Sequence, residues 1–182
     1  MIDYELKIVL LGEENTGKSK FYRNIIINDI IDSGQYVSTI ATCFMIKIIH
    51  FKNKIFKIKI WDTTGREEFN NLLTLYAKGS DVYLLFYNSL NRKSFKRVDK
   101  ILKAMKENNP NKNAIYILIC SKYDLKVEPD KDTNVVTEEE VLEYADKNNL
   151  LFCHLSNKEE YKKEISGILS KILNEYLKIN TQ

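Results

Sequence analysis

The sequence predicts an α/β fold with a mainly parallel sheet. Apolar strand-like runs alternate with helix-like segments along the whole chain, which is the order that places helices between parallel strands. The runs at 82–87 and 114–121 are almost continuously apolar, as central strands covered on both faces are. The chain has 182 residues, 44% hydrophobic and 29% charged. These values fit a soluble globular protein, and we expect a single domain over residues 1–182.

The first half of the chain supplies a strand, a helix and a hairpin. Glu5–Leu11 is predicted to be a buried first strand, and Gly17–Asn28 the helix that follows it. Asp29–Ser38 shows no clear periodicity and indicates a loop. Lysine alternates with isoleucine in Thr42–Phe51 and in Lys54–Trp61, which is the period of a half-exposed antiparallel hairpin.

The second half of the chain supplies three further strands and three helices. The strands are expected at Val82–Tyr87, Ala114–Ser121 and Leu150–His154. The helices are expected at Ser94–Asn108, Thr137–Asn148 and Glu159–Leu177. A capping box formed by Thr137 and Glu140 marks the start of the middle helix. The last helix carries apolar residues at helical spacing, which indicates packing against the core.

Residues 12–19 read Gly-Glu-Glu-Asn-Thr-Gly-Lys-Ser, the G-x-x-x-x-G-K-S pattern of a phosphate-binding loop. The glycines allow successive backbone N–H groups to face phosphate oxygens, and the next helix adds the positive end of its dipole. Lys18 is placed to reach the β- and γ-phosphates, and the Ser19 hydroxyl to ligate Mg²⁺. A glycine-containing turn that matches by chance is the alternative, and the flanking strand and helix disfavour it.

A second motif, Trp61-Asp62-Thr63-Thr64-Gly65, ends the second strand of the hairpin. A carboxylate at a strand end that faces a phosphate loop is suited to holding Mg²⁺, so we assign that role to Asp62. Gly65 allows its N–H to approach a γ-phosphate closely. The alternative is an ordinary loop with a capping aspartate.

A third motif, Ser121-Lys122-Tyr123-Asp124, follows a central strand. Asp124 can accept two hydrogen bonds from guanine, whereas adenine offers no matching donor pair, and the Lys122 stem can pack over the base. A surface lysine beside a turn aspartate is the alternative. The position at the carboxyl end of a strand favours base recognition, because ligands of α/β sheets bind there.

Charge and cysteine content exclude several classes of function. The net charge is only +3, so we expect no nucleic-acid partner. The three cysteines have the spacing of neither a zinc site nor a disulfide framework, and we expect them to be reduced. No apolar stretch is long enough to span a membrane, and the ends carry no signal peptide, myristoylation pattern or prenylation cysteine. We therefore expect a cytoplasmic protein, and either the chain is truncated or any membrane contact comes through a partner.

The order of these motifs resembles a Ras-superfamily small GTPase, and most of all its Rab branch, from about Tyr4 to Leu177. Besides the phosphate loop, the resemblance rests on Tyr36–Ile40, which is similar to the first switch, on K-I-K-I-W-D-T at 57–63, on Tyr76–Ser80 and on Leu85–Asn88. It implies a P-loop NTPase three-layer sandwich. Such a fold has a six-stranded, mostly parallel sheet with one antiparallel hairpin strand and about five helices.

The resemblance also implies roles for individual residues. The metal ligands would be Ser19, Thr39 and Asp62, and the catalytic residues Lys18, Thr39, Gly65 and Arg66. The loop at 156–158 resembles the S-A-K loop that touches guanine. The GTP- or GDP-binding residues would be Glu14, Asn15, Thr16, Gly17, Lys18, Ser19, Lys20, Ser121, Lys122, Asp124, Ser156, Asn157 and Lys158. An exchange factor, an activating protein and effectors would contact the loops around Tyr36–Phe44 and Gly65–Gly79.

Several residues depart from the family pattern. Arg66 replaces the water-positioning glutamine and has only donors, which predicts slow hydrolysis. Glu14 replaces a small residue beside the γ-phosphate; turned inward it would weaken GTP relative to GDP, and turned to the surface it would cost little. Ser121 replaces the usual asparagine, and Ile30 or Ile31 the aromatic that stacks on guanine. These losses predict weaker or faster-exchanging nucleotide.

The sequence therefore favours a Rab-like, Mg²⁺-dependent guanine-nucleotide switch with slow GTP hydrolysis that regulates vesicle trafficking. The first alternative is a hydrolysis-deficient pseudo-GTPase that acts as a nucleotide-bound interaction module, as Arg66 suggests. A different phosphate-loop enzyme, such as a nucleoside kinase, is disfavoured by the W-D-T-x-G strand end and by the Lys122–Asp124 motif.

Overall fold

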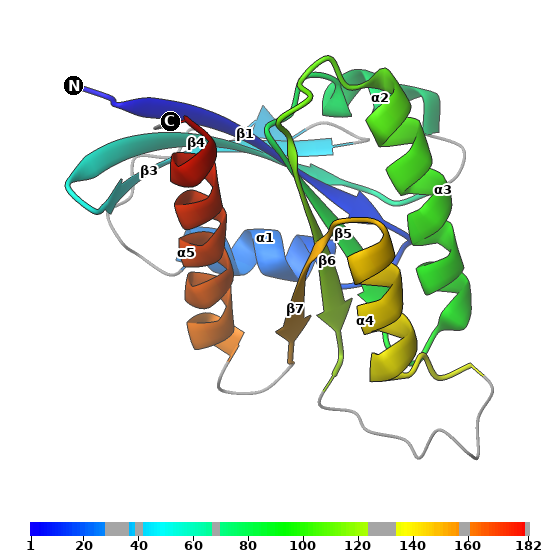
Figure 1. Cartoon of the computed structure of the whole chain (residues 1–182). Helices are drawn as coiled ribbons and strands as arrows, with labels where there is room; N and C mark the ends of the chain where they lie inside the picture. Colours follow the sequence, from blue (N-terminus) through cyan, green and yellow to red (C-terminus); the bar gives the residue numbers. More distant parts are fainter. Residues whose placement is uncertain (28–36, 39–41, 67–69, 124–133, 157–160, 181–182) are drawn as a thin grey trace.

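The computed structural model describes residues 1–27, 37–38, 42–66, 70–123, 134–156 and 161–180. These residues form a sheet with helices on both faces, which is a three-layer sandwich (Figure 1). In sheet order, the strands are β2 (Val37–Ser38), β3 (Thr42–Phe51), β4 (Lys54–Thr63), β1 (Tyr4–Gly12), β5 (Val82–Asn88), β6 (Ile115–Ser121) and β7 (Leu151–Leu155). Among these strands, β3 alone runs opposite to the others.

The predicted fold class is confirmed. All six expected strands are present, and β3 and β4 form the expected antiparallel hairpin. The described residues also contain a seventh strand, the two-residue β2 at the sheet edge, in a stretch where the sequence predicts a loop. Two residues are too few to show the alternation that identifies a strand, so the pattern could not reveal it.

The described residues contain five helices, as expected. They are α1 (Lys18–Ile27), α2 (Asn70–Ala77), α3 (Arg92–Asn108), α4 (Glu138–Lys147) and α5 (Tyr161–Asn180). Helix α3 begins before the predicted Ser94 because the Asn91 side chain caps it, accepting a hydrogen bond from the Ser94 N–H. The Thr137 cap of α4 is confirmed by its hydrogen bond from the Glu140 N–H at 3.3 Å.

The apolar core lies in two layers, one on each face of the sheet. Helices α1 and α5 cover one face and contribute residues such as Phe21, Tyr22 and Ile165. Helices α3 and α4 cover the other face, where Val98 and Val141 are completely buried. Figure 1 shows these two layers on opposite sides of the sheet. The central strands are therefore apolar on both faces, which explains their continuous hydrophobic sequences.

The parallel register brings three sequence-distant segments together at one end of the sheet, where the parallel strands have their carboxyl ends. Leu10 of β1 pairs with Asp62 of β4, and Gly12 pairs with Phe86 of β5. On the other side of β5, Asn88 pairs with Ser121 of β6. The loops that follow β1, β4 and β6 thus leave the sheet at this same end, where ligands of α/β folds bind.

No helix among the described residues is both long and apolar enough to cross a membrane.

Candidate functional site

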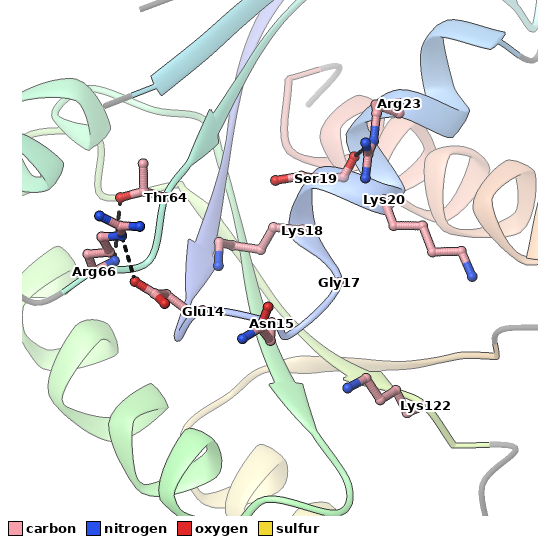
Figure 2. Close-up of a pocket in the computed structure, with 10 residues that line it drawn as sticks. All are labelled: Glu14, Asn15, Gly17, Lys18, Ser19, Lys20, Arg23, Thr64, Arg66 and Lys122. Carbon is pink, nitrogen blue, oxygen red and sulfur yellow. Dashed lines mark hydrogen bonds and ion pairs between the residues drawn. The ribbon is translucent and has the colours of Figure 1, made fainter. Parts of the chain in front are cut away.

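A cavity of about 680 Å³ opens at the carboxyl ends of the parallel strands (Figure 2). Its lining consists of Glu14, Asn15, Gly17, Lys18, Ser19, Lys20, Arg23, Thr64, Arg66 and Lys122. Five of these side chains are cationic and one is a carboxylate. A concave site with this excess of positive charge favours a compact polyanion, and its volume lies in the range of small-molecule sites.

The loop between β1 and α1 has the backbone conformation that a phosphate-binding loop requires. Gly12 has φ of 141°, and a Cβ atom there would collide with the Phe86 carbonyl oxygen. Asn15 and Gly17 also have positive φ, at 59° and 89°. Helix α1 then starts with a hydrogen bond from the Phe21 N–H to the Gly17 carbonyl. This strand, loop and helix sequence is the one that residues 12–19 predict.

Lys18 lies at the base of this loop with only 3% of its surface exposed. Its ammonium group donates hydrogen bonds to the carbonyl oxygens of Glu13 at 2.7 Å and Gly12 at 3.0 Å. Burial lowers the pKa of Lys18 to about 8, although the nearby Asp62 carboxylate opposes the shift. A buried ammonium whose closest hydrogen bonds go to neutral carbonyl oxygens is well placed to gain from phosphate oxygens.

Asp62, at the end of β4, is 6% exposed, and its Oδ1 atom has no hydrogen-bond partner among the described residues. Burial raises the pKa of this carboxyl, whereas hydrogen bonding with the Ser19 hydroxyl and the charge of Lys18 lower it. An unsatisfied buried carboxylate oxygen beside a hydroxyl group is a donor set that suits a hard divalent cation. The residues present therefore fit the magnesium site that the sequence predicts.

The segment after Asp62 closes one side of the cavity. Gly65 has φ of 78°, and a Cβ atom there would lie 2.6 Å from the Lys18 Nζ, so only glycine fits this approach. The next residue, Arg66, forms an ion pair with Glu14, with 2.9 Å between Nε and Oε1. Figure 2 shows the two side chains directed toward each other. Glu14 is 46% exposed, so the surface-turned alternative for this carboxylate is the one the structure shows.

Three of the predicted base-binding residues are described, and of these Lys122 lines the cavity on the side away from Arg66 (Figure 2). Lys122 lines the cavity and has φ of 58°, and its carbonyl accepts a hydrogen bond from Ser89 Oγ at 3.2 Å. Ser121 is buried beneath the phosphate loop, where its hydroxyl donates to the Tyr87 carbonyl at 2.9 Å. Ser156 donates its N–H and its hydroxyl to the Glu164 carboxylate of α5.

The structure brings most of the described candidates to one place. Seven of the predicted nucleotide-binding residues line the cavity, namely Glu14, Asn15, Gly17, Lys18, Ser19, Lys20 and Lys122. Thr16, Asp62, Gly65, Ser121 and Ser156 are not part of the lining. Thr16 is buried, and its hydroxyl donates to the Glu13 carbonyl at 2.7 Å. Thr39, Asp124, Asn157 and Lys158 lie outside the described residues.

Two lining residues, Arg23 and Thr64, were not predicted. Arg23 follows Ser19 by four positions in α1, and its Nε donates to the Ser19 carbonyl at 3.1 Å. Residues four apart share one face of a helix, so this spacing was the signal that could have found Arg23. Thr64 lies within the W-D-T-T-G motif and carries no separate signal.

The chain shares its sequence pattern with known proteins along most of its length. The model of the Ras family matches residues 7–178. The chain is 31% identical to Ras-related protein Rab-1 of Theileria annulata over 156 residues, covering 86% of this chain and 68% of that protein. It is 33% identical to Ras-related protein Rab-11B of Dictyostelium discoideum over 154 residues, covering 85% and 66%. With Ras-related protein Rab11A of Lotus japonicus it is 31% identical over 176 residues, covering 95% and 74%.

Proposed function

Since the chain is a divergent, Rab-like member of the Ras family, we propose that it is a Mg²⁺-dependent guanine-nucleotide switch with slow GTP hydrolysis. The observation that carries this proposal is the buried Lys18 ammonium at the base of a cavity lined by five cations. Such a site binds a polyphosphate more strongly than it binds a neutral or singly charged ligand.

Guanine recognition would come from the far side of the cavity. Lys122 lies where its stem can cover a base, and Asp124 would accept hydrogen bonds from the guanine N–H groups. Ser156, Asn157 and Lys158 would complete the base site. The hydrogen bond from the Ser121 hydroxyl to the Tyr87 carbonyl holds the end of β6, from which the loop with Lys122 starts.

The phosphate side would hold the metal ion. Ser19, Thr39 and Asp62 would hold Mg²⁺, which would supply positive charge to offset the negative charge of the nucleotide phosphates. Lys18 and the loop N–H groups stabilise the charge that develops on the phosphoryl group during transfer. Gly65 would offer its N–H to the γ-phosphate, because its backbone already lies against Lys18.

Hydrolysis would be slow because Arg66 directly follows Gly65, at the position where the family has its water-positioning glutamine. In the reaction, a water oxygen attacks the γ-phosphorus in line and the bond to the β,γ-bridging oxygen breaks, which yields GDP and phosphate. Arg66 cannot accept a hydrogen bond from that water, and its guanidinium is already paired with Glu14. The same observation favours the alternative, a hydrolysis-deficient protein that acts as a nucleotide-bound interaction module.

The proposal extends to partners and cellular role. Partners would recognise the loops around Tyr36–Phe44 and Gly65–Gly79, because these loops would change conformation when a γ-phosphate is present. An exchange factor, an activating protein and effectors would bind there. The chain would act as a cytoplasmic monomer that regulates vesicle trafficking and reaches endomembranes through these partners.

The nucleotide content and the single-turnover hydrolysis rate of the purified protein with Mg²⁺ test this proposal. Copurified GDP together with measurable GTP cleavage supports a working but slow switch. GTP that is bound and not cleaved supports the interaction module. A protein that binds ATP and GTP equally, or binds neither, overturns the guanine-nucleotide proposal.

A further inference from the structure

The phosphate loop carries two adjacent carboxylates, Glu13 and Glu14, which is an unfavourable composition for a polyphosphate site. Like charges repel through the low-dielectric surroundings of a loop more strongly than in bulk water. Both glutamates are nevertheless accommodated, and each pairs with a cation from a different part of the chain. The origin and position of these two cations suggest what they do.

Glu13 pairs with Lys93 of α3. The distance from the Lys93 Nζ to the Glu13 Oε1 is 3.2 Å, and the glutamate side chain is only 16% exposed while the lysine is 78% exposed. The second carboxylate oxygen of Glu13 is buried without a hydrogen-bond partner among the described residues. Lys93 therefore forms an ion pair with this largely buried carboxylate, which also interacts electrostatically with Lys18.

The start of α3 is held firmly, so Lys93 has a defined position. The Asn91 side chain accepts from the Ser94 N–H, and the Ser94 hydroxyl accepts from the Asn88 N–H. Arg92 donates to both carboxylate oxygens of Glu140, at 2.7 and 2.8 Å. These contacts anchor the residues on either side of Lys93 to β5 and α4.

Glu14 pairs with Arg66 within the lining of the cavity, of which Glu13 and Lys93 are not part. Both side chains line the cavity, and the ion pair joins the loop after β1 to the segment after β4 (Figure 2). The pair directs the Glu14 carboxylate toward Arg66. The two pairs thus draw adjacent carboxylates toward cations on separate elements.

We propose that Lys93 and Arg66 are positioning residues for the phosphate loop, each neutralising one glutamate and holding it away from bound phosphate. This inference rests on the proposed function and assigns Lys93 a role there. Without Lys93, less positive charge offsets Glu13, and its carboxylate repels a phosphate chain more strongly. Without Arg66, the Glu14 side chain turns toward the γ-phosphate, so GTP loses more affinity than GDP.

Calorimetric binding of GDP, GTP and inorganic tripolyphosphate to nucleotide-free protein tests the Lys93 pair. Exposed ion pairs contribute modestly, so we expect Lys93→Ala to weaken binding of all three about two- to fivefold and Lys93→Glu about tenfold. Adding Glu13→Gln to Lys93→Glu is expected to restore affinity to within about twofold of Glu13→Gln alone. The effect of Lys93→Glu is expected to shrink at high salt, where charges are screened.

Lys96→Glu is the matched control, because Lys96 is an exposed lysine one turn further along α3. It makes the same charge change and is expected to leave binding unaltered. Arg66→Ala tests the second pair and is expected to lower the GTP affinity more than the GDP affinity. That difference is expected to disappear when Glu14→Gln is added.

Unchanged binding in Lys93→Glu, at an unchanged melting temperature, overturns the inference. Loss of binding that Glu13→Gln does not restore also overturns it, because Lys93 would then act by another route. If the wild type binds tripolyphosphate but no guanine nucleotide, the proposed function fails and the variants still decide the inference with tripolyphosphate. A wild type that binds none of the three probes overturns both.

Discussion

At the scale of the residue, Lys18 couples phosphate binding at the site to its own protonation. Burial lowers the pKa of Lys18 to about 8 in the free protein, whereas phosphate oxygens favour its charged form. Above pH 8 the free protein has lost this proton, and phosphate binding must restore it. Affinity is therefore expected to fall as the pH rises above about 8.

Proton uptake on GDP binding measures this linkage. Calorimetry in two buffers of different ionisation enthalpy is expected to show uptake of a fraction of a proton at pH 8.5 and a smaller uptake at pH 7.5. Equal uptake at both values, or none at either, would show that Lys18 does not change its protonation on binding.

Arg66 gives a second prediction at this scale. Arg66→Gln supplies an acceptor for the attacking water and is expected to raise the single-turnover rate of GTP hydrolysis about tenfold. Arg66→Ala serves as the control, because it also removes the ion pair with Glu14 but supplies no acceptor. Equal rates in the two variants would mean that the ion pair, and not the missing acceptor, limits hydrolysis.

Not all residues of the site could be predicted from the sequence. Lys18, Ser19 and Asp62 lie in motifs whose spacing reflects a backbone requirement, and the structure brings them together. The pairing of Glu14 with Arg66 could not be predicted, because it depends on where two loops far apart in the chain leave the sheet. Neither residue has a signal in its local sequence that names the other.

At the scale of the element, the longer strands and helices were easier to predict from the sequence than the short elements. The six strands other than β2 carry either continuous or alternating apolar residues, and these patterns are typical of strands. Helix α2 has only eight residues, too few for a clear helical period, and only the family resemblance implied a fifth helix. A helix this short is stabilised mainly by packing against the rest of the protein, which its local sequence does not reveal.

The cap of α4 yields a prediction for element stability. Thr137→Ala removes the side chain that accepts from the Glu140 N–H and is expected to lower the free energy of unfolding by about 1 kcal/mol. Urea denaturation measures this loss. Thr137→Ser keeps the acceptor and is expected to keep most of the stability, so equal losses in both variants would show that the cap is not the cause.

At the scale of the whole molecule, the site joins segments from both halves of the chain. The phosphate loop follows β1, Asp62 lies at the end of β4 and Lys122 follows β6, so their meeting depends on the strand order β4-β1-β5-β6. A ligand that bridges these loops stabilises the whole domain, because it binds only the folded arrangement.

This coupling predicts a thermal shift. GDP with Mg²⁺ at a concentration of 100 times its Kd is expected to add about 2.7 kcal/mol and to raise the melting temperature by roughly 5–10 °C. ATP at the same concentration is expected to give no comparable shift, and Lys18→Ala is expected to abolish the GDP effect. A GDP shift that survives Lys18→Ala would place the ligand elsewhere on the protein.

The central place of β1 also has a consequence for biosynthesis. The first strand to leave the ribosome pairs Tyr4 with Phe56 on one side and Ile8 with Val82 on the other. At ordinary translation speeds, the second neighbour emerges only after a delay on the order of several seconds. During this time the apolar strand and its phosphate loop lack their sheet partners and remain open to chaperones. Nucleotide can therefore engage the nascent chain only late in its synthesis.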